Sequence, residues 1–313
     1  MVASTVALFA LCAILAPSSI SRGAIAGMLP FAAVLGVVGL GQMLVVQQGG
    51  IDLSAPGAMS LAIVIVSHEP NGDNAKLLPA VLLAIAYAIG AGAVNGFMVG
   101  RLGLNAIIAT LGTNALLYGL VLRISGGTPR TTTQLLGTIA GGSSLGVPNA
   151  AFFALAALIL VLVVVKMTVA GRRFEAIGAN AETARAIGLR SGVHRGAAYV
   201  WAQLLYCLAG VLLAGITTQP TAYEGDSFLL PSVAVVVLGG TSLLGGRGFP
   251  AATVVAALFL TQLGQFVLAL GVPNAIQTLV QAAALAVGVA IYTLNWVALR
   301  MTLAQRRSPA SIA

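Results

Sequence analysis

The chain has 313 residues, of which 59% are hydrophobic and only 7% charged, and its formal net charge is +8. A soluble domain carries about 25% charged residues, so this chain could not cover its own surface in water. The composition therefore predicts an integral membrane protein and excludes a soluble enzyme. The basic residues are thinly spread and lack the interleaved aromatic residues that stack on bases, so we expect no nucleic-acid partner.

Ten apolar segments, taken in chain order, predict an all-α fold with about ten transmembrane helices. The predicted spans are residues 2–16, 23–46, 53–67, 77–99, 104–122, 150–166, 197–216, 232–244, 251–270 and 274–294. Broken or short helices are expected near Gly49–Gly57 and Gly239–Gly248, where glycine pairs interrupt the apolar sequence. Residues 1–300 are predicted to form one polytopic transmembrane domain, followed by a cytoplasmic tail at 301–313.

The distribution of basic residues predicts the orientation of these spans. With the N-terminus inside the cell, four basic residues fall outside: Arg22, Lys76, Arg123 and Arg130. The other eleven of the 15 Lys and Arg residues fall inside, which is the bias that cytoplasmic loops show. We therefore expect cytoplasmic termini, and we expect Glu224 and Asp226 in an outer loop.

The two predicted breaks resemble each other. Val45–Gly57 and Val236–Gly248 both place an apolar run, a Gly-Gly pair, a hydroxyl-bearing residue and a further glycine in sequence. Interrupted segments in corresponding positions of two halves indicate a translocation path. The alternative is that Gly-Gly pairs recur by chance in a chain with 38 glycines.

A basic island, Gly171–Arg195, is the one sizeable polar stretch between the spans. It holds five arginines, and its middle has the signals of a short helix over 181–187. Asn180 is a good N-cap, Glu182 lies in the first turn where the helix dipole favours a negative charge, and Gly188 is the expected stop. The island is either a solvated loop whose arginines set the topology or an element that presses on a soluble partner.

Polar residues near the spans are candidates for a solute path. Asp52 is the most informative, because a carboxylate at a span is costly and marks a functional site by default. Neutral amides and hydroxyls could bind a hydroxylated solute. The candidate path residues are Asp52, Asn95, Asn105, Thr110, Asn114, Gln219, Gln277 and Gln281. The alternatives are that Asp52 caps the next helix and that the neutral residues make interhelical hydrogen bonds.

Metal and thiol chemistry find no support in the sequence. Cys12 and Cys207 lie in apolar runs, so we interpret them as small hydrophobic residues. His68 and His194 are the only histidines, and we expect both in loops, far from any cluster of metal ligands. We therefore predict no metal site and no catalytic residues.

Nucleotide-binding motifs are also incomplete. Gly240–Arg247 (GTSLLGGR) lacks the Lys-Ser/Thr ending of a phosphate-binding loop. Gly90, Gly92 and Gly96 follow no predicted strand, and Gly92 and Gly96 form a GxxxG pair that is typical of close helix packing. The chain is thus expected to carry no cofactor, and any ATP that drives it must be bound by another subunit.

Several longer motifs together resemble the permease subunit of bacterial ABC importers for monosaccharides, the ribose, xylose, arabinose and galactoside group. They are GGIDLS at 49–54, NGFMVGRLGLNAIIATLGT at 95–113, GRRFEAIGANAETARAIGL at 171–189, QPTAYEGDSFLLPSVAVVVLGGTSLLGGRG at 219–248 and GVPNAIQTLVQAAALAVGVA near the end. The resemblance covers roughly residues 25–295. The chain departs from the family pattern at its start, which lacks a charged segment before the first span, and at Pro56, where SAPG follows Asp52.

The resemblance implies a role for the island. Residues 168–196 would form a cytoplasmic coupling loop that contacts the ATP-binding subunit through Arg172, Ala176, Gly178, Asn180, Glu182, Ala184, Ile187 and Gly188. It also implies a second permease subunit, expected to be a second copy of this chain, one or two ATP-binding subunits that hold ATP and magnesium, and a periplasmic sugar-binding protein. The location would be the bacterial inner membrane. Bulky residues at Ala184 or Gly188 would then lower coupling and leave folding largely intact.

Two alternatives remain at this point. A related ABC permease could carry branched-chain amino acids or nucleosides on the same scaffold. An ion-coupled secondary transporter would need a titratable centre near the middle of the membrane, for which Asp52 is the one candidate.

Overall fold

A computed structural model describes residues 1–273 together with 276, 279, 282, 283 and 286. The described residues form nine apolar helices: α1 (Val2–Leu15), α2 (Arg22–Gln47), α3 (Ala55–His68), α4 (Leu77–Gly96), α5 (Ala106–Ser125), α7 (Asn149–Leu162), α10 (Ser191–Thr217), α11 (Leu229–Leu238) and α12 (Pro250–Ala269). Each overlaps a predicted span, although α11 ends at Leu238, six residues before the end of the span predicted over 232–244, and the all-α membrane fold is confirmed. Most of the tenth predicted span, 274–294, and all of the tail lie outside the described residues.

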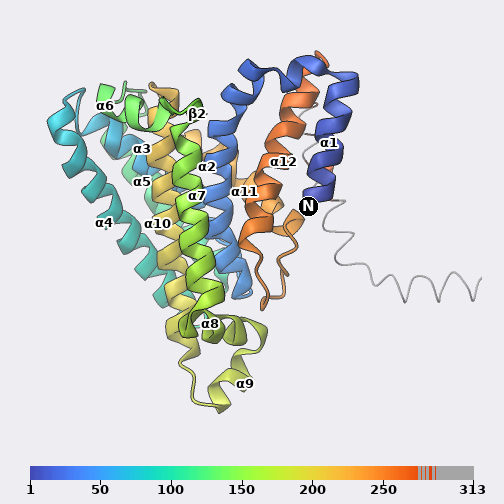
Figure 1. The fold of residues 1–313 in the computed structure, drawn as a ribbon. Helices are drawn as coiled ribbons and strands as arrows, with labels where there is room; N and C mark the ends of the chain where they lie inside the picture. Colours follow the sequence, from blue (N-terminus) through green and yellow to red (C-terminus); the bar gives the residue numbers. More distant parts are fainter. Residues whose placement is uncertain (274–275, 277–278, 280–281, 284–285, 287–313) are drawn as a thin grey trace, which may run out of the picture.

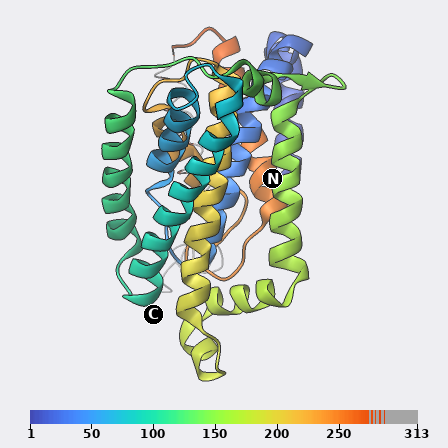
Figure 2. The same ribbon diagram turned by 90° about the vertical axis from the view of Figure 1, so that its left-hand side faces the viewer.

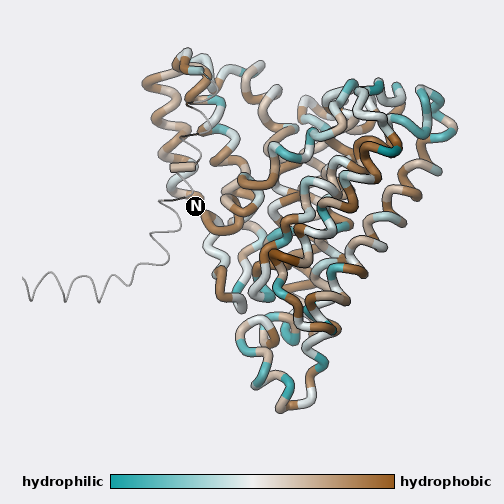
Figure 3. The backbone as a smooth tube through the Cα atoms, turned by 180° about the vertical axis from the view of Figure 1, so that it is seen from behind, coloured by the Kyte–Doolittle hydropathy of each residue, from teal (hydrophilic) through white to brown (hydrophobic). Residues whose placement is uncertain are grey.

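Length and composition support membrane insertion. Among the described residues, six helical stretches are long and apolar enough to span a bilayer, the longest being Asn74–Arg101. α1 and α3 are shorter apolar helices. Figure 3 shows that hydrophobic segments run along the bundle while many of the hydrophilic ones gather at its two ends.

Helix α2 is the centre of the bundle (Figure 1). It packs against α7, α10, α11 and α12, and all of its residues from Ala32 to Gln47 are buried. Two glycines make this close packing possible. A Cβ at Gly39 would lie 2.6 Å from Val235 Cγ2, and one at Gly41 would lie 2.7 Å from the Tyr206 ring.

The short elements gather at the two ends of the bundle. At one end lie α8 (Val169–Ala179) and α9 (Ala181–Ala186). At the other lie α6 (Gln134–Leu136) and a hairpin in which β1 (Ser143–Ser144) pairs antiparallel with β2 (Val147–Pro148), matching Ser143 with Pro148 and Ser144 with Val147 (Figure 2). The basic island and the predicted outer loop between the fifth and sixth spans therefore occupy opposite ends.

A seam of glycines joins α4 to α10. A Cβ at Gly92 would lie 2.6 Å from Val200 Cα, one at Gly96 would lie 2.6 Å from the Gly196 carbonyl oxygen, and one at Gly100 would lie 2.5 Å from the Gly192 carbonyl oxygen. The interpretation of Gly92 and Gly96 as packing glycines is thus confirmed, and the seam continues one turn further. A Cβ added at Gly90, in contrast, would meet no neighbouring element within 4 Å among the described residues.

This contrast gives a matched pair of substitutions on one helix. Gly96→Val should destabilise the protein by about 1–3 kcal/mol, because the side chain meets backbone atoms that cannot rotate away. Gly90→Val adds the same side chain to open space and should change stability far less. Thermal unfolding in detergent measures both, and equal midpoints for the two variants would contradict the α4–α10 seam.

Candidate functional site

The basic island consists of two helices. The predicted short helix is present as α9, which ends at Ala186. Asn180 is extended (φ −158°, ψ 102°), and its Oδ1 accepts from the backbone nitrogens of Glu182 (3.0 Å) and Thr183 (2.9 Å). Gly188 follows with φ +85°, as expected of a helix stop.

Three local expectations need correction. The sequence did not predict α8, whose first turn is capped by Thr168 Oγ1 accepting from the Gly171 nitrogen at 3.0 Å. Residues 191–196 of the predicted loop form the first turns of α10, so His194 is helical, and His68 is the last residue of α3. The starts of α8 and α10 and the end of α3 depend on packing against other parts of the fold, which the sequence alone does not reveal.

Two glycines fix α8 to the rest of the chain. Gly171 and Gly178 are seven residues, about two turns, apart and share a face. A Cβ at Gly171 would lie 2.1 Å from the Val165 carbonyl oxygen, and one at Gly178 would lie 2.1 Å from the Gln47 carbonyl oxygen. Both contacts are with backbone atoms, so any residue larger than glycine at either position would force α8 to move.

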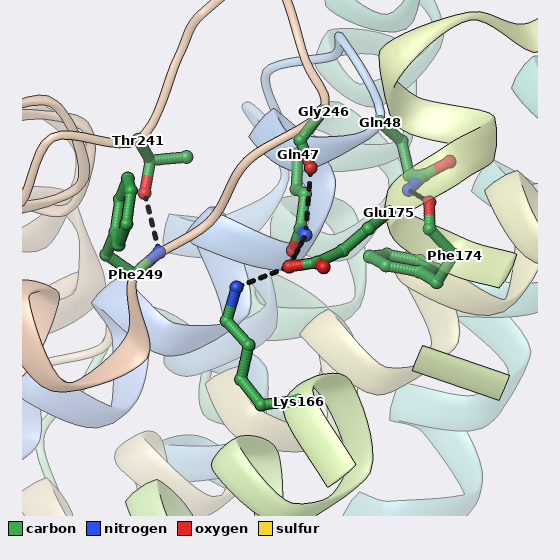
Figure 4. Close-up of polar contacts among 8 residues, drawn as sticks. All are labelled: Gln47, Gln48, Lys166, Phe174, Glu175, Thr241, Gly246 and Phe249. Carbon is green, nitrogen blue, oxygen red and sulfur yellow. Dashed lines mark hydrogen bonds and ion pairs between the residues drawn. The ribbon is translucent and has the colours of Figure 1, made fainter. Parts of the chain in front are cut away.

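Gln47, the last residue of α2, is the centre of this contact (Figure 4). Its carbonyl oxygen accepts from the Gly246 nitrogen at 2.9 Å, and its side-chain nitrogen donates to the Gly246 carbonyl oxygen at 3.0 Å. The same nitrogen donates to Glu175 Oε1 at 3.3 Å, and Lys166 forms an ion pair with Glu175. We call the contact among Gln47, Lys166, Glu175, Gly178 and Gly246 the α8 junction.

The α8 junction brings both predicted breaks together. Gln47 begins the first break, and Gly245 and Gly246, with φ of +91° and +92°, form the tight turn of the second. The neighbouring Gln48 side chain also donates to the Phe174 carbonyl oxygen of α8 at 2.9 Å. A displacement of α8 would therefore act directly on the ends of two interrupted transmembrane segments.

The candidate coupling residues do not all face outward. Arg172, Ala176, Asn180, Glu182, Ile187 and Gly188 are exposed, and Gly178 is half-buried at the α8 junction. Ala184 is only 2% exposed, so a bulky side chain there would displace α9. The expectation that folding tolerates such a change at Ala184 stays a prediction, now with a displaced α9 as the expected cause of lost coupling.

A groove of about 800 Å³ lies beside α9, between the end of α4 and the start of α10. Arg101, Arg185 and Arg190 are among its lining residues. Within the described part of the chain, Arg185 pairs with Glu182 at 4.0 Å, an exposed pair of little strength. The groove is therefore positively charged and suits an acidic surface.

The first break folds back into the bundle. Gly49 turns the chain with φ +77°, and Pro56 lies in the first turn of α3, where proline is favoured. The Gln42 amide pairs with the backbone of Asp52, in the amide orientation that satisfies both of its atoms: its nitrogen donates to the Asp52 carbonyl oxygen and its oxygen accepts from the Asp52 nitrogen, each at 3.2 Å. Asp52 consequently lies level with the last two turns of α2 and is fully buried.

Neutral polar groups surround the Asp52 carboxylate. Its Oδ1 accepts from the Ser54 nitrogen (2.9 Å) and hydroxyl (2.5 Å), and its Oδ2 accepts from Gln203 Nε2 (3.4 Å). Ser54 Oγ accepts in turn from Asn95 Nδ2 at 2.9 Å and from Gln203 Nε2 at 2.7 Å, and Thr113 donates to Asn95 Oδ1 at 2.6 Å. We call Asp52, Ser54, Asn95, Thr113 and Gln203 the Asp52 cluster.

Two further candidate path residues bind the same break from α5. Thr110 Oγ1 accepts from the Leu53 nitrogen at 2.9 Å, and Asn114 Oδ1 accepts from the Gly57 nitrogen at 2.9 Å. The structure thus gathers Asp52, Asn95, Thr110 and Asn114 around one re-entrant segment, where each bonds to its backbone or to its Ser54 side chain.

The other candidate path residues lie elsewhere. Asn105 is an exposed N-cap whose Oδ1 accepts from the Ile107 nitrogen at 2.9 Å, and Gln219 is exposed beyond the far end of α10. Gln277 and Gln281 lie outside the described residues. Gln42, Gln47 and Ser54 were missed, although glutamines within an otherwise apolar helix are a signal that could have identified the first two.

Comparison with known proteins identifies the family. A family model described as the permease component of branched-chain amino acid transport systems matches residues 24–289. The chain belongs to this family. No solved structure matches the chain.

Individual relatives are named as import permeases, two of them for sugars. The chain is 33% identical to the ribose import permease of Bacillus subtilis (strain 168) over 276 residues, 86% of this chain and 84% of the relative. It is 33% identical to the autoinducer 2 import system permease of Enterobacter sp. (strain 638), over 82% of this chain and 75% of the relative. It is 30% identical to the fructose import permease of Bifidobacterium longum (strain NCC 2705), over 75% of this chain and 68% of the relative.

These matches establish the chain as a permease of the ribose and sugar group of ABC importers. Such a subunit is a multi-pass membrane protein that is not catalytic and carries no cofactor, because the ATPase is a separate component of the system. ABC permeases work with an ATPase and a binding protein. The ion-coupled alternative is thereby excluded.

Proposed function

We propose that this permease translocates a monosaccharide that a periplasmic binding protein delivers, driven by ATP hydrolysis on a separate subunit that contacts α8 and α9. The α8 junction is the observation that carries the proposal, because it links the exposed island to the ends of both breaks. The permease would act as a dimer of this chain in the bacterial inner membrane, with cytoplasmic termini. The opposite locations of the basic island and of the predicted outer loop that holds α6 and the hairpin support that orientation (Figure 1).

The proposed mechanism follows from what α8 contacts. Closure of the ATPase would displace α9 and α8, and α8 would carry Gln47 and Gly246 with it. α10 begins beside the island and continues to the opposite end of the bundle as one helix of 27 residues. Through Gln203 it also reaches the Asp52 cluster, so the same displacement would reach the first break by two routes.

The substrate class is supported by the names of the relatives and by the chemistry of the bundle. The ribose and fructose permeases are named for monosaccharides, and the autoinducer 2 permease for a different solute. Polar groups near the first break are mostly amides and hydroxyls, which suit a neutral polyol better than a zwitterionic amino acid. A nucleoside or branched-chain amino acid is the second candidate, and the family description favours the amino acid.

The contact with the ATPase can be tested at Ile187, whose side chain is 72% exposed next to α9. Ile187→Asp should weaken co-purification with the ATPase by about tenfold, because it places a carboxylate in an interface that an apolar residue would fill. Leu145→Asp is the matched control, since Leu145 is 98% exposed in the hairpin at the opposite end. Complex formation in detergent, measured by affinity capture, compares the two.

Equal capture of both variants at wild-type levels would refute an ATPase contact through α9. Loss of capture with both would show that the effect comes from a general loss of folded protein. Sugar uptake in proteoliposomes that contain the permease, its ATPase and the binding protein tests the substrate class separately.

A further inference from the structure

The segment between α10 and α11 enters the bundle and does not form an outer loop. It contains the 3₁₀ turn η6 (Glu224–Phe228), whose Gly225 nitrogen donates to Ser60 Oγ of α3 at 3.2 Å. A Cβ at Gly225 would lie 2.3 Å from the Pro56 carbonyl oxygen, so η6 packs against the first two turns of α3. The expectation that Glu224 and Asp226 occupy an outer loop is therefore wrong.

Helix lengths give the depth of η6. Ser60 lies eight residues before the end of α3 at His68, which is about 12 Å at 1.5 Å per residue. α11, which follows η6, has 10 residues and separates it by about 15 Å from the second break. The two estimates place η6 near the middle of a hydrocarbon core that is about 30 Å thick.

Two carboxylates thus lie at a depth where charge is costly. Neither takes part in the ion pairs of the described residues, which join Lys166 to Glu175 and Arg185 to Glu182. Their described partners are neutral: Tyr118 donates its hydroxyl to Asp226 Oδ1, and Thr221 donates to Glu224 Oε2 from its hydroxyl at 2.6 Å and from its backbone nitrogen at 3.2 Å. Asp226 is exposed, so it retains acceptor capacity toward the surface of the bundle.

Aromatic rings lie beside these carboxylates. Tyr118 and Tyr223 pack edge to face, with ring centroids 5.4 Å apart and an interplanar angle of 64°. Tyr223 is 42% exposed, which leaves ring surface free for a further contact. A sugar has the complementary chemistry, because its hydroxyls donate to carboxylates while its C–H faces lie against the electron-rich face of an aromatic ring.

The same face of α5 connects this cluster to the first break. Thr110, Asn114 and Tyr118 are spaced by four residues, so they lie one above another on the helix. Thr110 and Asn114 bind the backbone of the first break, and Tyr118 binds Asp226. A polar stripe on α5 therefore leads from the re-entrant segment to η6.

We propose that Tyr118, Tyr223, Glu224 and Asp226 form a binding site for a monosaccharide partway across the membrane. The inference rests on the proposed function and names the site at which the solute is held during transport. Asp226 and Glu224 accept hydrogen bonds from sugar hydroxyls, and Tyr223 supplies an apolar ring surface. The hydroxyl that Tyr118 donates to Asp226 holds that carboxylate in place.

The test uses the complete importer in proteoliposomes, with radiolabelled ribose and fructose as probes. Asp226→Asn and Tyr223→Leu should each lower uptake by about tenfold. The first variant weakens a hydrogen bond between the carboxylate and a sugar hydroxyl, and the second removes the contact between the sugar and the aromatic ring. ATPase stimulation by the loaded binding protein and the thermal midpoint should stay at wild-type values. Tyr118→Phe keeps the ring and loses the hydroxyl, so its uptake should fall to an intermediate value.

Glu69→Gln is the matched control, because Glu69 is an exposed carboxylate just beyond the end of α3. Wild-type uptake by Asp226→Asn and Tyr223→Leu would overturn the site and leave the proposed function standing. Uptake that requires sodium in the wild type and loses that requirement in Asp226→Asn would assign the carboxylates to a cation and overturn the sugar assignment. A wild-type importer that takes up neither sugar overturns the proposed function and this site together.

Discussion

Replacing Gly178 with valine should uncouple ATP hydrolysis from transport while the membrane bundle stays folded. The new Cβ would lie 2.1 Å from the Gln47 carbonyl oxygen, and Gly178 is also close to the Gly246 nitrogen. Both obstacles are backbone, so α8 has to move away from the α8 junction. Coupling between two sites typically changes an affinity by about 5- to 150-fold. We expect the stimulation of ATPase activity by the loaded binding protein to decrease by a factor of about this size.

Helix propensity allows the cause to be identified. Glycine costs a helix about 1 kcal/mol relative to alanine, so Gly178→Ala would stabilise an isolated α8. A loss of coupling in Gly178→Ala as well as in Gly178→Val can therefore come only from the lost approach to Gln47. The measurement is ATPase activity of the assembled importer, with and without the loaded binding protein.

Gly112→Val supplies the matched control for this experiment. Gly112 lies within α5, and an added Cβ there would meet no neighbouring element within 4 Å in the described part of the chain, so the same substitution should leave coupling unchanged. The thermal unfolding midpoint of each variant shows whether the helix bundle remains as stable as in the wild type. Normal stimulation in Gly178→Val would show that the α8 junction does not transmit the motion of the ATPase.

Local signals were sufficient to predict part of the island. The cap at Asn180, the acidic first turn at Glu182 and the stop at Gly188 act within one or two turns, so α9 could be placed from the sequence. α8 could not, because Gly171 and Gly178 lower its intrinsic helix propensity. Its position depends on contacts with Gln47 and Val165, which are visible only once the chain is folded.

The same distinction separates the polar residues that were predicted from those that were missed. Asp52 and Asn95 stand out singly in apolar sequence, but their common partner Ser54 resembles any serine before a helix. The position of η6 was missed for a similar reason. Its Gly, Asp and Ser residues are typical of a surface turn, and only the bond from Gly225 to Ser60 shows that this turn lies inside the bundle.

Replacing Asp52 with leucine should strongly destabilise the protein, whereas Asp52→Asn should be nearly neutral. Leucine leaves the Ser54 nitrogen and hydroxyl and the Gln203 amide without their acceptor, and each buried donor left unpaired costs about 1–3 kcal/mol. Asparagine keeps an oxygen for both Ser54 donors. Only the 3.4 Å contact with Gln203 becomes unfavourable, at a cost of about 1 kcal/mol.

This graded series separates a structural carboxylate from one that must ionise during transport. If Asp52 holds the first break in place through the Asp52 cluster, transport by Asp52→Asn should follow its thermal stability and keep the pH dependence of the wild type. Asp73→Asn is the control, because Asp73 also accepts a backbone hydrogen bond, from Ala75 at 2.9 Å, but is exposed at a loop. A stable Asp52→Asn variant that no longer transports sugar would show that the charge of Asp52 takes part in the transport cycle. The closed set of neutral donors around Asp52 favours the structural role, since the described residues satisfy the carboxylate without a basic group or a free path to water.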